Sequence, residues 1–222
     1  MQSRTDANRV AEILTVAYPD AKTALNGDNP FHILTATILS AQCTDSRVNE
    51  TTPALFAAYP DAPAMADAAI ERLEELIRPV GFHRSKAKNL KGMAQSLVKI
   101  HGGVVPRDLA SLTALPGVGR KTANVVLANA YEIASGFVVD THVKRLAYRL
   151  GLSVSANAEI IERDLKAAFP RSQWIETSRR LILHGRAVCR SRRPRCELCP
   201  LIELCPRNGL AVNHRHAHSG HS

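Results

Sequence analysis

The sequence LPGVGRKTA at residues 115–123 is the feature that most limits how this chain can fold, because it is a short glycine turn between two helical patterns. Before the turn, leucine recurs at every third position, at 109, 112 and 115. After it, apolar residues follow the i, i+3, i+4, i+7 spacing of a helix with one buried face. They are Ala123, Val126, Leu127 and Ala130. We therefore expect two helices joined in a hairpin.

The turn also has the features of an anion site. Gly117 and Gly119 free the backbone to take positive φ and to approach another molecule closely. The N–H groups at the start of the following helix attract anions, and a nucleic-acid phosphate suits them. Arg120 and Lys121 lie at this helix end, where the helix dipole disfavours cations. We therefore favour phosphate binding over a plain helical corner capped by glycine.

Lys121 points to a more specific chemistry. Next to Arg120 and the positive end of the dipole, its ammonium should be destabilised, which raises the fraction of neutral amine. Neutral amines form Schiff bases with carbonyl carbons. A further phosphate contact is the alternative, and this stretch alone leaves both open.

Charge and length narrow the class of protein. The chain has 222 residues, enough for one large domain or two small ones, and a formal net charge of +9. Such a basic protein most often meets nucleic acid or an anionic surface. The first ten residues hold no apolar segment, and no apolar run approaches the roughly 18 residues of a membrane span. We therefore expect a cytoplasmic protein that does not bind membranes and keeps its thiols reduced.

The remaining patterns are helical. Apolar spacing predicts an all-α protein of about ten helices, without strand alternation. Asn29 before Pro30 is a good helix N-cap, and residues 65–77 read as one helix. The helix before the hairpin should bury Ala87, Leu90, Ala94, Leu97 and Val98.

Three residues at predicted corners have two interpretations each. Gln42 can cap backbone groups, which is the simpler role, or replace the hydrogen bonds of a base pair. Phe82, beside Gly81, is either a core residue or an exposed wedge. Asp140 follows a short apolar run at residues 137–139 and is a plausible helix N-cap. A carboxylate that faces a nucleophilic amine needs a similar anchored position, so the cap and a catalytic role are compatible.

Four of the five cysteines fall in one short loop with the spacing C-x6-C-x2-C-x5-C. Their thiolates could enclose a tetrahedral zinc or an iron–sulfur cluster, and the spacing does not decide between them. Using all four as ligands leaves no open position, so we expect a structural centre. Arginines nearby can offset the anionic centre and meet phosphate. They are Arg186, Arg190, Arg192, Arg193, Arg195 and Arg207. Residues 211–222, rich in histidine, are expected to be a disordered tail.

Taken together, the hairpin, the VDTHV sequence at residues 139–143, the SAQ sequence at 40–42 and the cysteine loop resemble the endonuclease III family of DNA glycosylases and AP lyases. The resemblance spans roughly residues 10–206. It implies two all-α domains: a six-helix barrel with the hairpin over residues 25–135, and a cluster domain over residues 1–24 and 136–210. The flipped base would enter a cleft between the two.

The resemblance also implies a role for each motif residue. Lys121 would be the Schiff-base nucleophile and Asp140 its carboxylate partner. A [4Fe–4S] cluster would bind Cys189, Cys196, Cys199 and Cys205. Gln42 would fill the gap left by the everted nucleotide, and Phe82 falls where the family often has an intercalating leucine. Further DNA contacts are implied for Leu115, Gly117, Val118, Gly119, Arg120, Thr122 and His142.

The implied activity is excision of oxidised pyrimidines by a monomer, from double-stranded DNA that contains damaged pyrimidines or abasic sites. β-Elimination would then cut 3′ to the abasic site. One alternative is a monofunctional glycosylase of the same superfamily, such as an adenine-mismatch enzyme, which typically lacks the hairpin lysine. Another is a non-catalytic DNA-binding protein, which would give no reason for Lys121 and Asp140 to occur together.

Overall fold

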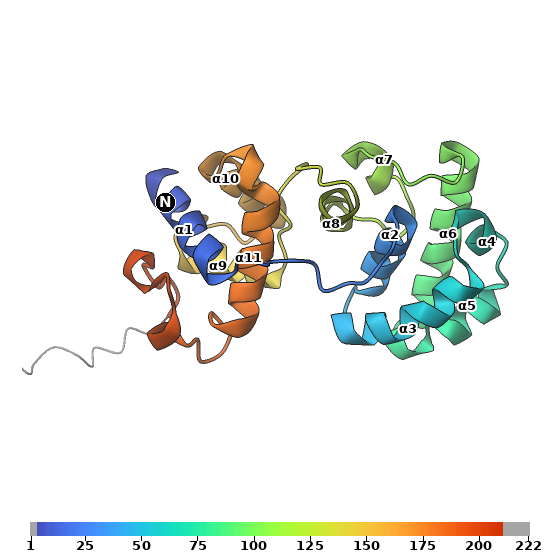
Figure 1. Ribbon diagram of the computed structural model, residues 1–222, viewed down its shortest axis with the longest axis horizontal. Helices are drawn as coiled ribbons and strands as arrows, with labels where there is room; N and C mark the ends of the chain where they lie inside the picture. The colour runs from blue at the N-terminus through green and yellow to red at the C-terminus, as the bar shows by residue number, and fades with distance from the viewer. Residues whose placement is uncertain (1–3, 211–222) are drawn as a thin grey trace, which may run out of the picture. The chain divides into compact units, whose positions relative to one another are not determined.

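Figure 1 shows a computed structural model of the chain, in which residues 4–210 are described. These residues form α-helices and short 3₁₀ helices and contain no strand, as the all-α prediction requires. The α-helices are α1 (Arg4–Ala17), α2 (Pro30–Leu39), α3 (Asp45–Ala58), α4 (Ala62–Ala66), α5 (Ile70–Leu76), α6 (His83–His101), α7 (Leu109–Thr113), α8 (Arg120–Ala130), α9 (Thr141–Arg149), α10 (Ala158–Ala168) and α11 (Trp174–Ala187). The 3₁₀ helices are η1 (Arg78–Val80), η2 (Arg171–Gln173), η3 (Cys196–Leu198) and η4 (Ile202–Leu204).

The described residues divide into two compact units. The hairpin unit is one continuous segment, residues 22–138. The cysteine unit combines α1 and the residues up to 21 with residues 139–210. The domain limits predicted at 24/25 and 135/136 stay predictions, and the predicted disordered tail lies outside the described residues.

Several helix ends follow from single residues. Asn29 is the N-cap of α2, and its side chain accepts a hydrogen bond from His32 N at 2.9 Å, with Pro30 as the first helical residue. Gly102 ends α6 in the left-handed conformation, with φ of 59°. Gly151 follows α9 with φ of 70°. These predicted start and stop signals are confirmed.

The prediction of one helix over residues 65–77 is wrong. The chain instead forms α4 and α5, separated at residues 67–69. Ala69 has an extended backbone with ψ of 130°, and this bend lets Met65, Ala68 and Leu73 all be buried. The predicted burial of Val98 is also wrong, because this residue of α6 is 41% exposed.

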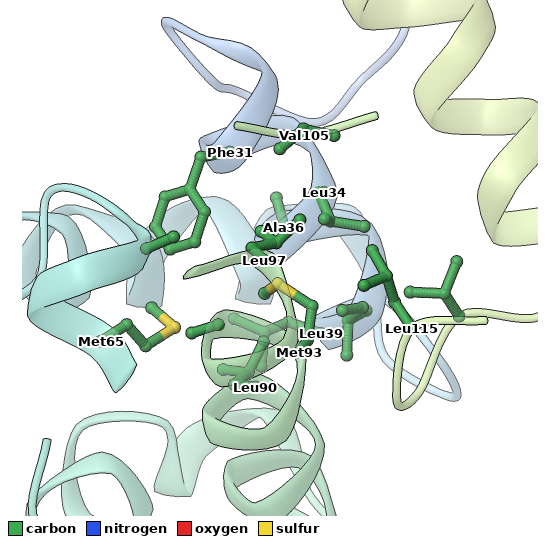
Figure 2. Packing of buried hydrophobic residues seen from close by; sticks show 14 of the residues in the cluster. Phe31, Leu34, Ala36, Leu39, Met65, Leu90, Met93, Leu97, Val105 and Leu115 are labelled. Carbon is green, nitrogen blue, oxygen red and sulfur yellow. The ribbon is translucent and has the colours of Figure 1, made fainter. Parts of the chain in front are cut away.

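The hairpin unit has its own hydrophobic core, centred on α2 and α6. Figure 2 shows Leu34 and Leu39 of α2 beside Leu90, Met93 and Leu97 of α6. Leu112, Leu115 and Val118 join the same core from α7 and the hairpin turn. The hairpin is therefore fixed to the unit by the apolar residues on either side of its glycines.

The cysteine unit is packed around α1, α9, α10 and α11. Its fully buried residues include Val10, Leu14, Leu146, Ile161, Leu165 and Leu181. Burial of these side chains brings the N-terminal helix against a helix that lies far away in the sequence. In the part of the chain that the structure describes, no helix has the length and apolar character needed to cross a membrane.

Candidate nucleic-acid interface and cysteine centre

The predicted hairpin is present in the hairpin unit, and one of its glycines is required by the geometry of the turn. α7 ends at Thr113 and α8 begins at Arg120. Gly117 has φ of 76°, in the left-handed region that favours glycine. A Cβ built on Gly117 would lie 2.8 Å from Cβ of Asn89 on α6. The turn can therefore pack on α6 only with glycine at this position.

The second glycine differs from the prediction. Gly119 has φ of −84°, so it does not use the positive-φ freedom expected from the sequence. It is the N-cap of α8 and has no side chain to accept a hydrogen bond from the first turn. A Cβ built there would meet nothing within 4 Å, so the backbone at the start of α8 is open to close approach. Six other helices have side-chain caps: Asn29, Thr44, Asp61, Asp108, Asp140 and Asn157.

The charged residues of the hairpin lie on its surface, and the apolar ones do not. Arg120 and Lys121, the first two residues of α8, are exposed, and Thr122 is half-buried. Leu115 and Val118 are only 4% and 5% exposed. Any contact between these two residues and a ligand would come from the backbone. The hairpin thus offers two cations beside the N-terminal end of a helix.

Gln42 lies in the turn between α2 and α3 and is exposed, with φ of 54°. Other residues provide the caps at this corner. Ser40 is the C-cap of α2, and Thr44 is the N-cap of α3, its side chain accepting from Arg47 N at 3.4 Å. The helix-capping role considered for Gln42 is therefore taken by its neighbours.

Phe82 is not a core residue. It is 67% exposed and has a left-handed backbone, with φ of 47°, directly before the first residue of α6. Gly81 before it also has positive φ, 68°. A large apolar side chain held in solvent at the start of a helix matches the wedge interpretation rather than the packing one.

α6 supports both Phe82 and the hairpin turn. Asn89 lies against Gly117, as described above, and a Cβ built on Gly92 would be 3.3 Å from Cγ of Pro116. Phe82 and the hairpin therefore share one rigid helix within the hairpin unit. No sequence pattern indicated this packing, because the two contacts join residues on separate helical patterns.

Asp140 lies in the cysteine unit and caps α9. Its Oδ1 accepts hydrogen bonds from the N–H groups of His142 and Val143, both at 2.8 Å. The predicted N-cap is confirmed, and the carboxylate is half-buried in a fixed orientation. The ring of His142 lies 3.1 Å, Nδ1 to Nη2, from Arg145. Lys121 belongs to the hairpin unit.

The four clustered cysteines line one hollow, together with Arg149 and Arg207. Burial raises the pKa of Cys199 to about 11, and the three neighbouring cysteines act in the same direction. A single zinc would need its ligands about 2.3 Å from one point. Within residues 4–210, no three His, Cys, Asp or Glu side chains form such a group.

Arg149, on α9, contacts the cysteine loop through its guanidinium group. Its Nη1 lies 3.3 Å from Sγ of Cys189 and 2.6 Å from the carbonyl oxygen of Arg190, and Nη2 donates to Ser191 O at 3.0 Å. Only 8% of Arg149 is exposed. Arg149 is not among the nearby arginines that were expected to offset the charge of the centre, and its role was not predicted from the sequence.

A buried histidine reaches a second cysteine. His184 of α11 has Nδ1 3.0 Å from the hydroxyl of Tyr18 and Nε2 3.4 Å from Sγ of Cys199. Burial lowers the pKa of His184 to about 4, so the ring is neutral at pH 7. A neutral imidazole donates through one nitrogen and accepts through the other. With the Tyr18 hydroxyl donating to Nδ1, the Nε2 proton points at the sulfur.

These contacts place N–H groups beside the cysteine sulfurs. Four cysteines share one hollow, and two of their sulfurs have N–H groups within reach, from Arg149 and His184. Such N–H groups are typical of the surroundings of metal-bound thiolates. Arg145 and Arg149 are four residues apart, so the sequence indicates that they share one face of a helix. It does not indicate that this face contacts the cysteine loop.

Comparisons with known proteins agree with this geometry. A family profile described as HhH-GPD superfamily base excision DNA repair protein matches residues 35–171. Endonuclease III of Synechocystis sp. is 50% identical over 200 residues, which cover 90% of this chain and 91% of that protein. Endonuclease III of Bacillus subtilis is 41% identical over 189 residues, covering 85% and 86%.

A solved structure is similar in both fold and sequence. It is a trapped endonuclease III–DNA covalent intermediate, an estranged-adenine complex. The TM-score is 0.89 and the sequences are 38% identical, with coverage of 93% of this chain and 97% of that one. The similarity therefore extends over nearly the whole chain, including both units.

Proposed function

The chain belongs to the endonuclease III family within the HhH-GPD superfamily, and we propose that Lys121 is the amine through which it acts. The protein is a DNA glycosylase with AP lyase activity in base excision repair. It removes a base from DNA and cuts the strand at the abasic site. The observation that carries the proposal is Lys121 itself, exposed in the first turn of α8 beside an open glycine backbone.

The hairpin supplies the contact with the DNA backbone. Phosphate oxygens accept from N–H groups at the start of α8, where Gly119 leaves room for them to approach. Arg120 adds a cation at the same place. Binding of a phosphate there offsets the unfavourable placement of two cations at the positive end of a helix. It also brings a sugar of the same strand within reach of Lys121.

The chemistry then needs one nucleophile. Nζ of Lys121 attacks C1′ of the deoxyribose, the bond from C1′ to the base breaks, and the base leaves with a proton. The C1′–O4′ bond then breaks, O4′ takes up a proton as the sugar ring opens, and the resulting C1′ iminium acidifies the C2′ proton. Loss of that proton breaks the C3′–O bond, which is β-elimination 3′ to the abasic site, and water releases Lys121. The Asp140 carboxylate, fixed by α9, stabilises positive charge on the sugar.

The target nucleotide must leave the stack before this reaction. Eversion costs a few kcal/mol and is easiest for a damaged base. We propose that exposed Gln42 fills the gap with its amide and that exposed Phe82 inserts beside it. The substrates are oxidised pyrimidines or abasic sites in double-stranded DNA, and the protein acts as a monomer in the cytoplasm. His142 stays a proposed DNA contact.

We also propose that Cys189, Cys196, Cys199 and Cys205 hold a [4Fe–4S] cluster. The hollow that they line and the N–H groups of Arg149 and His184 support this assignment. When bound, the cluster would serve as a structural cross-link that orders the arginine-rich loop. Arg190, Arg192 and Arg193 in that loop are exposed and available to DNA phosphates.

The test is covalent trapping on a duplex that contains thymine glycol. Borohydride should reduce the Schiff base and link the unaltered protein to DNA, while Lys121→Ala should bind the duplex without being trapped. Lys99→Ala, an exposed lysine at the far end of α6, is the matched control and should be trapped normally. Trapping that survives Lys121→Ala refutes the assignment. Excision without strand cutting would instead indicate a monofunctional glycosylase, and binding without excision a non-catalytic protein.

A further inference from the structure

Lys86 is a buried cation that the proposed reaction does not use. It lies in the first turn of α6 and is only 5% exposed, which is rare for lysine. Its Nζ donates to two backbone carbonyls, Leu39 O and Val80 O, each at 2.9 Å. An ammonium buried this deeply cannot contact DNA itself, so any part that it plays must be indirect.

The two carbonyls stand at the base of the two proposed insertion segments. Leu39 is the last residue of α2, three residues before Gln42. Val80 is the last residue of η1, two residues before Phe82. One side chain therefore ties together the backbone just before each residue that is proposed to enter the duplex.

Electrostatics explain how the cation is tolerated there. The carbonyl of Leu39 belongs to the C-terminal end of α2, where the helix dipole favours positive charge. Burial lowers the pKa of Lys86, and Cys43 acts in the opposite direction. A buried ammonium costs stability relative to an apolar side chain of similar size. Folding stability alone is thus a poor reason for lysine at this position.

Backbone strain marks the same two segments. Gln42 and Phe82 both have left-handed φ, 54° and 47°, although neither is glycine. Such conformations are strained for residues other than glycine, and they persist only where the surrounding structure holds them. The hydrogen bonds from Lys86 hold the chain three residues before Gln42 and two residues before Phe82.

We propose that Lys86 is a positioning residue that holds the Gln42 turn and Phe82 at a fixed separation, so that both side chains enter the duplex together. This inference rests on the proposed function and deepens it. Segments ordered in the free protein need not be ordered during binding, so their insertion loses less conformational entropy. The task of Lys86 is in base extrusion rather than in the chemistry at the sugar.

The experiment compares two substrates with Lys86→Met, which keeps most of the volume and removes the ammonium. Single-turnover excision of thymine glycol from a paired duplex should fall by about tenfold or more, because extrusion of a stacked base needs both insertions. Cleavage of a preformed abasic site, which has no base to extrude, should change by about twofold or less. Lys99→Met, the same change at an exposed position of α6, should alter neither rate.

A double-mutant cycle distinguishes positioning from general damage. If Lys86 acts through Phe82, the loss caused by Lys86→Met should shrink in the Phe82→Ala background. Lys86→Arg keeps N–H donors for both carbonyls, so it should retain part of the excision rate that Lys86→Met loses. If Lys86→Met does not fold, Lys86→Arg replaces it in the double-mutant cycle. Equal losses on both substrates, full additivity with Phe82→Ala, or no loss at all would each overturn the inference.

Failure of the proposed function would look different. The unaltered chain would then excise no thymine glycol and cut no abasic site, and both proposals would fall together. If the unaltered chain is active and Lys86→Met excises thymine glycol at the same rate, only the inference about Lys86 is refuted.

Discussion

Asp140 caps α9 and is also proposed to act as a catalytic carboxylate, and these two roles can be separated by substitution. Both hydrogen bonds to the first turn of α9 go to Oδ1. Asparagine also caps helices well, through its amide oxygen, whereas alanine cannot. The carboxylate charge and the cap can therefore be removed one at a time.

We expect the free energy of unfolding of Asp140→Asn to lie within about 0.5 kcal/mol of that of the unaltered protein, because the cap is kept. The variant should lose most of its base excision, because the carboxylate charge is gone. Asp140→Ala should lose excision and also about 1 kcal/mol of stability. Urea denaturation and single-turnover excision measure the two effects.

Asp108 provides the matched control. It caps α7 in the same manner, with Oδ1 accepting from Ser111 N at 2.8 Å, and it is exposed. Asp108→Asn should leave excision intact. Full activity of folded Asp140→Asn would show that capping is its only role.

At the scale of residues, local chemistry could be predicted and distant partners could not. The Asp140 cap depends on residues two and three positions away, so its pattern is visible in the sequence. Lys86 bonds a carbonyl 47 residues away, and Arg149 reaches a sulfur 40 residues away. Nothing in the sequence near a lysine or arginine shows which carbonyl or thiol the fold brings to it.

The hairpin depends on two glycines for different reasons, which predicts opposite results for the same substitution. Gly117 has positive φ and contacts Asn89, whereas Gly119 has ordinary φ and open space around it. A methyl group is therefore strained at the first position and tolerated at the second.

Gly117→Ala should destabilise the hairpin unit by about 1–3 kcal/mol, from left-handed strain together with the clash at Asn89. The midpoint of urea unfolding measures the loss. Asn89→Ala leaves Cβ of residue 89 in place, so it should relieve only the part of the clash due to the amide group. An unchanged midpoint for Gly117→Ala would contradict the strain argument.

Gly119→Ala should have about the stability of the unaltered protein, because the lower entropy of its unfolded chain offsets the poorer N-cap preference of alanine. It should bind duplex DNA several-fold more weakly, since its methyl group occupies the open side at the start of α8. Fluorescence anisotropy measures the affinity. Normal affinity would show that DNA does not approach this backbone.

At the scale of elements, periodicity predicted the helices around the hairpin and failed at residues 65–77. Helical spacing cannot show a bend that buries residues on both sides of it, as at Ala69. The hairpin itself was found because a Gly-x-Gly turn and two apolar stripes agree.

At the scale of the whole molecule, the cysteine unit is expected to depend on the proposed [4Fe–4S] cluster. The loop of residues 189–205 is held by two buried side chains, Arg149 and His184, and contains only short 3₁₀ helices. The hairpin unit has an apolar core of its own. Loss of the centre should therefore affect the two units unequally.

Cys199→Ser should reduce bound iron and inorganic sulfide and remove the brown colour that we expect of the unaltered protein. Amide hydrogen exchange should accelerate in α9 and α11 but not in α2 or α6. Cys43→Ser, outside the cluster loop, is the control and should keep its iron. A colourless protein with one zinc would overturn the cluster assignment.

The net charge of +9 predicts strong salt dependence of DNA binding. Affinity for an undamaged duplex should fall by about tenfold or more between roughly 50 and 200 mM salt, as phosphate contacts are screened. Arg120→Ala should reduce the slope of log affinity against log salt by about one. An unchanged slope would mean that Arg120 does not contact a phosphate.

The discontinuous make-up of the cysteine unit has a consequence for synthesis on the ribosome. α1 is translated first, yet Tyr18 pairs with His184 and its carbonyl oxygen accepts from Arg180, both on α11. The apolar face of α1 therefore stays exposed to solvent while residues 22–138 are synthesised. α1 can pack against α11 only after α11 has left the ribosomal exit tunnel.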